Sequence, residues 1–355
     1  MRENEMLFGK GDRMNKIQAM TLVLIFVQTV VVFSATPQVE FAQGKNKIDV
    51  IVGEELFTSY LYVPKLPKPS WVPVCTPSGI PVTRRYPPTE LKGGSMDHEH
   101  HVGLFFTVDG VNGTNFWNYY RNPGGNEPKI KHIKVEEMSG GKGEGKLVTR
   151  AQWIDKKGKV ILVEKKTMVF TAGENENILD CSIDLTAQDE KVIFEDIEEG
   201  VFALRLSDYL RESKASVSLQ PGDPIPKENV TGTGRYFSSN GDVTAKNIWG
   251  KRARWVALQG VKKGKVVGVA ILNHPASINY PTYWHVRNYG LFSANPLGQG
   301  DFQRQQPKKY RKNKVIPLRL TLEQGETAHF RFLIIVYEGF RTNQQIEERF
   351  KKFVE

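Results

Sequence analysis

The chain has 355 residues, of which 39% are hydrophobic. This is enough for one large β domain or two ordinary ones with a real core, and it excludes disorder as the main state. The formal net charge of +10 is typical of nucleic-acid-binding proteins, but here the lysines are spread through turns and solvent faces rather than interleaved with aromatic residues. We therefore expect no nucleic-acid partner.

The N-terminal 36 residues carry a predicted export signal. Lys10, Arg13 and Lys16 precede an uncharged, apolar run over residues 17–39, which is the pattern of a signal peptide. The run also approaches the roughly 20 residues needed to span a bilayer, so an uncleaved N-terminal anchor is the alternative and the only membrane link we expect. Either way the sequence predicts a periplasmic or secreted protein whose folded part is residues 37–355.

Two cysteines, Cys75 and Cys181, fit that compartment and could form one disulfide. Nothing in the sequence shows that they are adjacent. A cysteine-based zinc site is excluded, because the chain has no Cys-x-x-Cys motif.

Apolar and polar residues alternate from residue 47 almost to the end, which is the period of half-buried strands. Three hairpins are predicted, joining residues 146–154 to 160–169, 254–260 to 266–272, and 316–322 to 328–336. The clearest helical signal is at residues 343–355, where Ile346, Phe350 and Phe353 share one face. We therefore predict a single all-β domain of large antiparallel sheets with a short C-terminal helix.

The histidine cluster at residues 97–101 is the strongest chemical signal, because it holds three of only seven histidines beside two carboxylates. Imidazoles next to carboxylates suit proton transfer or metal ligation. If this segment is a strand, His98 and His100 share one face, whereas Asp97, Glu99 and His101 lie on the other. The alternative is a polar strand edge that faces solvent.

A second group lies in the turn-rich segment 273–307, and long loops on a β scaffold are where binding groups concentrate. Tyr283, Trp284 and Tyr289 offer flat apolar faces, while the neighbouring His285, Arg287 and Asn288 offer directed polar contacts. A sugar ring presents an apolar face and a rim of hydroxyls, so this mixture suits a carbohydrate. The alternative is that Trp284 and Tyr289 belong to the core and His285 caps a turn.

Two further segments are strongly charged. The acidic run 195–199 usually marks a solvated edge, but it supplies Glu198 and Glu199 as candidate catalytic carboxylates. The basic run 308–314 is typical of a solvated loop, and any ligand of it would be an acidic glycan or a membrane surface. The chain has no Gly-x-Ser-x-Gly elbow, phosphate-binding glycine loop, His-Glu-x-x-His or dinucleotide fingerprint, which argues against a serine hydrolase, a kinase or a dehydrogenase.

Several ordered motifs together resemble a known bacterial family. They are residues 81–84, 97–104, 111–113 with 116–117, 199–200 with Arg205, 274–275, 283–290 and 295–298. This set resembles the family labelled "methane oxygenase PmoA". The chain departs from the family pattern at Glu99 and Val102, where proline and arginine are expected. We reject methane oxidation, because a membrane monooxygenase subunit needs several spanning helices and this sequence has one apolar segment.

The resemblance implies a galactose-mutarotase-like β-supersandwich whose concave face accommodates a carbohydrate, although fold alone does not settle function. It implies further substrate-binding candidates, which are Arg84, His101, Asn112, Trp117 and Arg205, beside Tyr283, Trp284, Arg287, Asn288 and Tyr289.

Three functions follow from these residues. The first is an exported enzyme acting on a sugar ring as an epimerase, lyase or hydrolase, with His98, His100 or His285 as the acid and Glu198 or Glu199 as the base. The second is a metal-dependent enzyme, in which His98, His100, His285 and Glu198 bind a divalent zinc, iron or manganese ion. The third is a glycan-binding protein without catalysis.

Overall fold

The computed structural model describes residues 36–88, 94–118, 127–212, 219, 222–225, 232–307 and 314–355. The chain divides into residues 1–35 and a compact unit, Thr36–Glu355. The predicted export signal and most of the basic run 308–314 lie outside the described residues. Within the described ranges, no helix has the length and apolar character needed to cross a membrane.

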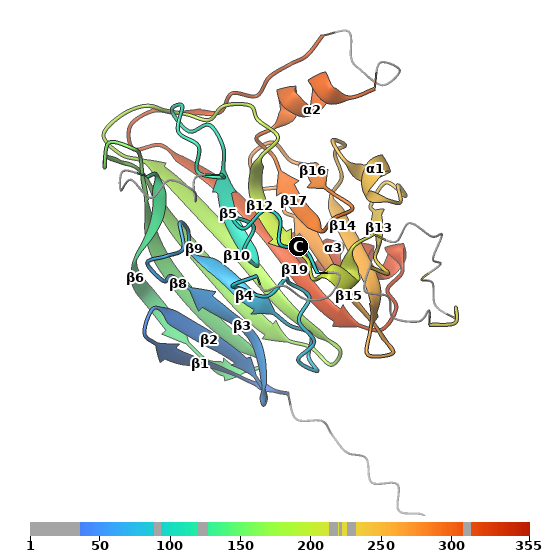
Figure 1. Ribbon diagram of the computed structural model, residues 1–355. Coiled ribbons are helices and arrows are strands. Elements are labelled where there is room, and N and C mark those ends of the chain that lie inside the picture. Colours follow the sequence, from blue (N-terminus) through green and yellow to red (C-terminus); the bar gives the residue numbers. More distant parts are fainter. Residues whose placement is uncertain are drawn as a thin grey trace, which may run out of the picture. The chain divides into compact units, whose positions relative to one another are not determined.

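Two large sheets, in which every strand pair is antiparallel, make up the unit (Figure 1). The nine-stranded sheet runs in the order β16 (Tyr283–Val286), β17 (Leu291–Asn295), β12 (Gly200–Arg205), β5 (Leu104–Val108), β4 (Ser70–Val74), β3 (Glu55–Leu61), β2 (Lys47–Val52), β1 (Gln38–Gly44) and β7 (Gly141–Lys142).

The eight-stranded sheet runs in the order β13 (Arg235–Ser238), β14 (Trp255–Lys262), β15 (Lys265–Asn273), β19 (Thr327–Glu338), β10 (Glu176–Ala187), β9 (Val160–Ala172), β8 (Glu144–Ile154) and β6 (Lys129–Ser139). A small third sheet pairs β11 (Val192–Ile193) with β18 (Thr321–Leu322). The helices are η1 (Asp208–Leu210), α1 (Ala245–Ile248), α2 (Gln299–Gln305) and α3 (Asn343–Val354).

The main core lies between the two sheets, because every second side chain of each strand points inward. Phe202 of β12 stacks on Phe332 of β19 with ring centroids 4.6 Å apart, and Phe106 of β5 contacts Phe330 of β19 at 5.4 Å. These contacts join one sheet to the other. They confirm the all-β class and the large antiparallel sandwich.

Helix α3 confirms the predicted C-terminal helix. Thr342 and Gln345 form a capping box at its N-terminus, so two otherwise unpaired backbone N–H groups are satisfied. Its buried residues Ile346, Phe350 and Phe353 pack on the outer face of β14, β15 and β19. The helix therefore covers part of the eight-stranded sheet on the side away from the main core.

Two of the three predicted hairpins are confirmed, as β8 pairs with β9 and β14 pairs with β15. The third is wrong. Strand β19 pairs with β10 on one side and β15 on the other, so no free edge remains for residues 316–322, and β18 pairs with β11 instead. The possible disulfide is also absent, because Cys75 and Cys181 are both buried free thiols.

Candidate functional site

The candidate site lies against the outer face of one end of the nine-stranded sheet. Register aligns His285 of β16, Ser293 of β17, Ala203 of β12 and Phe105 of β5 in one row across four strands. Their neighbours along the chain, such as Trp284, belong to the core between the sheets. Strand alternation therefore turns this row away from the core.

A cavity of about 470 Å³ opens above this row, within the size range of small-molecule sites. It is lined by His98, His100, His101, Trp117, Asn118, Glu199, His285, Arg287, Asn288, Tyr289 and Leu291. The cavity thus brings together the histidine cluster, one residue of the acidic run and the 285–289 segment, which are far apart in the sequence.

The histidine cluster is a loop rather than a strand, because β5 begins only at Leu104. The backbone turns between His98 and His101, where the His101 N–H donates to the His98 carbonyl at 3.0 Å. His98 has a φ of 45°, a left-handed conformation that is uncommon for residues other than glycine. The prediction that His101 points away from His98 and His100 is therefore wrong, because a turn does not alternate side chains as a strand does.

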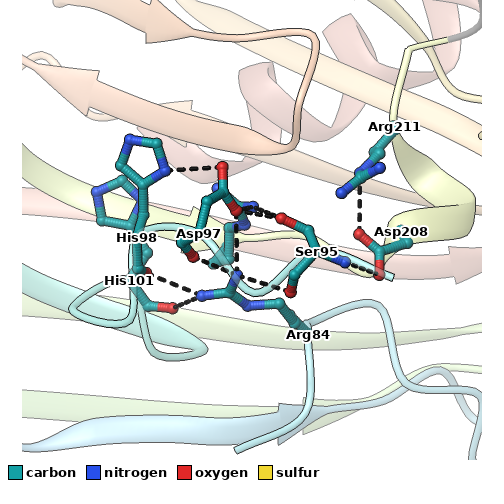
Figure 2. A network of polar contacts seen from close by, with 8 residues as sticks. Arg84, Ser95, Asp97, His98, His101, Asp208 and Arg211 are labelled. Carbon is teal, nitrogen blue, oxygen red and sulfur yellow. Dashed lines mark hydrogen bonds and ion pairs between the residues drawn. The ribbon is translucent and has the colours of Figure 1, made fainter. Parts of the chain in front are cut away.

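Arg84 holds this loop in place (Figure 2). Its guanidinium, which is buried, donates to the carbonyls of Ser95, Asp97, His98 and His101 at distances between 2.7 and 3.3 Å. Arg84 does not line the cavity. It lines a neighbouring pocket of about 830 Å³ instead, and its predicted role as a direct substrate contact stays a prediction.

Four nearly parallel rings form one wall of the site. Tyr289 stacks on His98 at 5.0 Å, His98 stacks on His101 at 5.0 Å, and His101 stacks on Phe105 at 5.8 Å, with interplanar angles of 7°, 10° and 17°. Trp117 meets His101 edge-on at 5.3 Å. These contacts restrict the imidazole of His98 to one plane.

Asp97 and His98 form a hydrogen-bonded pair, with 2.8 Å between an Asp97 carboxylate oxygen and His98 Nδ1. Although burial raises the pKa of Asp97, hydrogen bonds from Ser95 and His98 and the charge of Arg205 lower it to about 2. The carboxylate is thus ionised and can only accept, so His98 Nδ1 carries the proton. In the neutral form of the imidazole, Nε2 then carries the lone pair.

The two other loop histidines are neutral. Burial, together with the charge of Lys68, lowers the pKa of His100 to about 3. Burial also lowers the pKa of His101 well below its usual value, and both of its ring nitrogens are without a hydrogen-bond partner among the described residues. His101 lines the cavity, but it is 2% exposed and both of its ring nitrogens are buried in the cavity wall.

His285 is committed to its protein neighbours. Its Nε2 accepts from Arg287 Nε at 2.9 Å, so its Nδ1 carries the proton and donates to the Glu198 carbonyl at 2.9 Å. Burial and the charge of Arg287 lower the pKa of His285 to about 3. Both ring nitrogens of His285 are thus engaged by protein groups in this structure, and its predicted roles as general acid and metal ligand stay predictions.

The two candidate glutamates differ. One carboxylate oxygen of Glu198 accepts from Arg287 at 3.3 Å, and Glu198 does not line the cavity. Glu199 does line it, and burial, reinforced by the negative charges of Glu198 and Asp109, raises its pKa to about 7. Glu199 is thus the carboxyl group that can exchange a proton near neutral pH.

Several other predicted binding residues lie outside the cavity. Trp284 is fully buried in the core and its Nε1 donates to the Ala253 carbonyl at 3.0 Å, which is the alternative considered for it above. Tyr283 stacks on Phe302 of α2 at 5.4 Å. Asn112 bonds to the backbone of Lys191 and Ile193. These three have structural partners and do not reach the cavity.

The predicted metal site does not assemble. No group of three or more His, Cys, Asp or Glu side chains within the described ranges is placed to hold a metal ion. His98 is paired with Asp97 through Nδ1, and both nitrogens of His285 are engaged. The proposed set of His98, His100, His285 and Glu198 therefore lacks a shared centre.

Sequence reasoning missed the roles of Asp97, Ser95 and Lys68. Asp97 orients His98, and its adjacency to the first histidine was the available signal. Ser95 bonds to Asp97 and accepts from Arg205 Nη2 at 2.9 Å. Lys68 donates to the His100 carbonyl at 3.1 Å from beneath the loop, a long-range contact that no local pattern encodes.

Comparison with known families places the chain directly, since one family model matches residues 47–351. The chain belongs to the DUF6807 family. This is a family of unknown function. A search of curated proteins finds no match.

Among solved structures, the chain is similar to a glycoside hydrolase family 97 enzyme in complex with panose from Pseudoalteromonas sp. strain K8, with 8% identity and a TM-score of 0.35. The match covers 84% of this chain and 34% of that one, so the chain spans about a third of the enzyme's length. The Slr1438 protein from Synechocystis sp. PCC 6803 is similar at 10% identity and a TM-score of 0.33, with 87% and 99% of the two chains covered. None of these similarities assigns an activity.

Proposed function

We propose that this protein is an exported, carbohydrate-active enzyme that transfers protons to and from a sugar ring in the cavity described above. The observation that carries the proposal is that His98, which Asp97 orients, and Glu199 line the same cavity. One is an oriented base and the other is a carboxyl group with a pKa of about 7. The resemblance to the family labelled methane oxygenase PmoA also stays a proposal, and it supplies no activity.

His98 is suited to act as the general base. Asp97 fixes its Nδ1 proton, so the other ring nitrogen can take a proton from a substrate group in the cavity. The stack with Tyr289 and His101 holds the ring in position, which reduces the entropy lost when substrate and base are aligned.

Glu199 is suited to act as the general acid. With a pKa of about 7 it is partly protonated at neutral pH and can give a proton to a ring oxygen or a leaving oxygen. Each such proton transfer contributes roughly 10²- to 10⁴-fold to a rate. An oriented base and an acid of this kind are common to epimerases, lyases and hydrolases that act on sugars.

The remaining cavity residues fit a sugar ring. The partly buried Tyr289 supplies aromatic surface for the C–H face of a pyranose, and Asn288 and Arg287 supply polar groups for its hydroxyls. Trp117 lines the cavity but is almost fully buried. His101 adds a neutral imidazole without a partner among the described residues. We therefore retain Trp117, His101, Arg287, Asn288 and Tyr289 as proposed substrate-binding residues.

The test is turnover of a panel of mono- and oligosaccharides by the full chain, with product formation and binding measured together. Substitutions His98→Gln and Glu199→Gln are expected to lower the rate by about 10²-fold or more while sugar affinity changes little. Glu54→Gln, in the exposed turn between β2 and β3, is the matched control. Wild-type rates in both site variants would refute the assignment. Binding by the wild-type chain without any product would favour the glycan-binding alternative.

A further inference from the structure

Buried cations gather beneath the histidine loop. The Arg205 side chain is fully buried and its guanidinium lies 4.9 Å from the ring centroid of Tyr289, which lines the cavity. Lys68 is 2% exposed and its ammonium lies 4.9 Å from the Phe105 ring centroid. Arg84 is 6% exposed and holds the loop itself. Three basic side chains therefore lie under one wall of the cavity. The two guanidinium groups are charged at neutral pH, whereas burial lowers the pKa of Lys68 to about 7.

Few carboxylates offset the charges of the two arginines, Arg84 and Arg205, within the described residues. Asp97 is shared, because it forms ion pairs with both Arg84 and Arg205. The next carboxylate in the network, Asp208, pairs with Arg211 (Figure 2). A buried cation that is incompletely paired is costly, so an anion bound nearby would be stabilised by this wall.

Arg205 is the clearest case of an incompletely paired buried cation. Its Nη2 bonds to Ser95 and Asp97, but its Nε and Nη1 are buried and have no hydrogen-bond partner in the part of the chain that the structure describes. A buried donor without an acceptor carries a desolvation cost that native structures rarely leave unmet.

His101 connects this charge to the cavity. It lines the cavity, and its two ring nitrogens are likewise without partners among the described residues. Both Arg205 and Lys68 act on it electrostatically. As a neutral imidazole it carries one N–H donor, so an acceptor placed against it would also lie in the field of the cations below.

We propose that the substrate of this site carries a carboxylate, as a uronic acid residue does, and that the carboxylate is held at the His101 end of the cavity above Arg205 and Lys68. This inference rests on the proposed carbohydrate function and specifies its substrate class. Charge-assisted hydrogen bonds are roughly twice as strong as neutral ones, and in a site of reduced dielectric the surrounding cations add to that preference.

The experiment is calorimetric titration of the full chain with methyl glucuronide and methyl galacturonide, each against the matching neutral methyl glycoside, and with galactose 6-sulfate as a second anion. We expect the uronides to bind at least about tenfold more tightly than the neutral sugars, a difference of about 1.4 kcal/mol. Lys68→Met is expected to reduce that preference, whereas Lys246→Met, at an exposed position of α1, should preserve it.

A second measurement uses the wild-type chain, so it does not depend on whether a substituted chain folds. The nuclear magnetic resonance chemical shifts of the His101 ring nitrogens should change when a uronide is added and should not change when the neutral glycoside is added. Equal affinity for acidic and neutral sugars would overturn the inference while leaving the proposed function in place. Tighter binding of the sulfate than of the uronides would overturn the carboxylate assignment. Binding of none of these sugars would count against the proposed function itself and remove the inference with it.

Discussion

The carboxyl group of Glu199 should make the stability of this protein fall as the pH rises toward neutrality. Its pKa is about 7 in the folded chain, compared with 4.5 for an ordinary glutamate, and the causes are burial and the neighbouring charges of Glu198 and Asp109. Between these two values the folded chain keeps a proton that the unfolded chain has released. The folded state is therefore stabilised below about pH 4.5 relative to neutral pH, and this advantage is lost as the pH rises through about 7.

The substitution Glu199→Gln removes this effect, because an amide does not ionise. A pKa difference of this size corresponds to at most about 3 kcal/mol, and partial exposure of the side chain reduces the expected value to about 2 kcal/mol. We expect Glu199→Gln to be more stable than the wild type by about 2 kcal/mol at pH 8, and to lose that advantage at pH 4.5. Replacing a functional residue commonly raises the stability of a protein and lowers its activity, so this result would be typical of a functional site.

The assay is urea denaturation of the wild type, Glu199→Gln and the control Glu54→Gln at pH 4.5 and pH 8, with the free energy of unfolding compared at each pH. The control should show a difference from the wild type that is the same at both values. If Glu199→Gln also differs from the wild type by a constant amount, the carboxyl group is not perturbed, and its assignment as the general acid fails.

Two further predictions concern structure. Glu164 and Lys166 form an ion pair of 2.8 Å inside the sandwich core, with both side chains almost fully buried, so Glu164→Gln should lower the free energy of unfolding by about 3 to 5 kcal/mol. The double variant Glu164→Gln with Lys166→Met removes the unpaired ammonium and keeps an acceptor for Trp153 Nε1, so it should recover most of that loss in urea denaturation. An additive loss would contradict the argument. Arg84→Lys should accelerate amide hydrogen exchange in the loop over residues 95–101 and weaken sugar binding. The reason is that an ammonium group cannot bond to four carbonyls at once. Exchange at the wild-type rate would show that Arg84 does not position the histidines.

The fold was largely predictable, because alternation of apolar and polar residues is a local property of strands. The pattern identified the β8–β9 and β14–β15 hairpins and the buried face of α3. It failed at residues 316–322, where the outcome depended on which edges of β19 were already paired. That competition between strands is decided by the whole sheet and leaves no trace in the local sequence.

The candidate site was predictable in its residue types but not in its roles. Composition alone indicated the 97–101 cluster. Strand alternation does not apply there, but it does at β16, where Trp284 enters the core and His285 faces outward, although both are predicted from the sequence to face a pocket. The difference lies in the backbone: residues 283–286 form a strand, whereas His98 has a positive φ within a turn fixed by Arg84.

The sequence by itself determined the β class, the C-terminal helix and the histidines and carboxylates available for chemistry. Only the tertiary structure decided which of them meet. Strands β5, β12, β17 and β16 are neighbours in the sheet although they come from distant parts of the chain, and their order brings His98, Glu199 and Tyr289 to one cavity. The burial that gives Glu199 a pKa near neutrality and leaves His285 without a free nitrogen arises from those long-range contacts, which local periodicity does not encode.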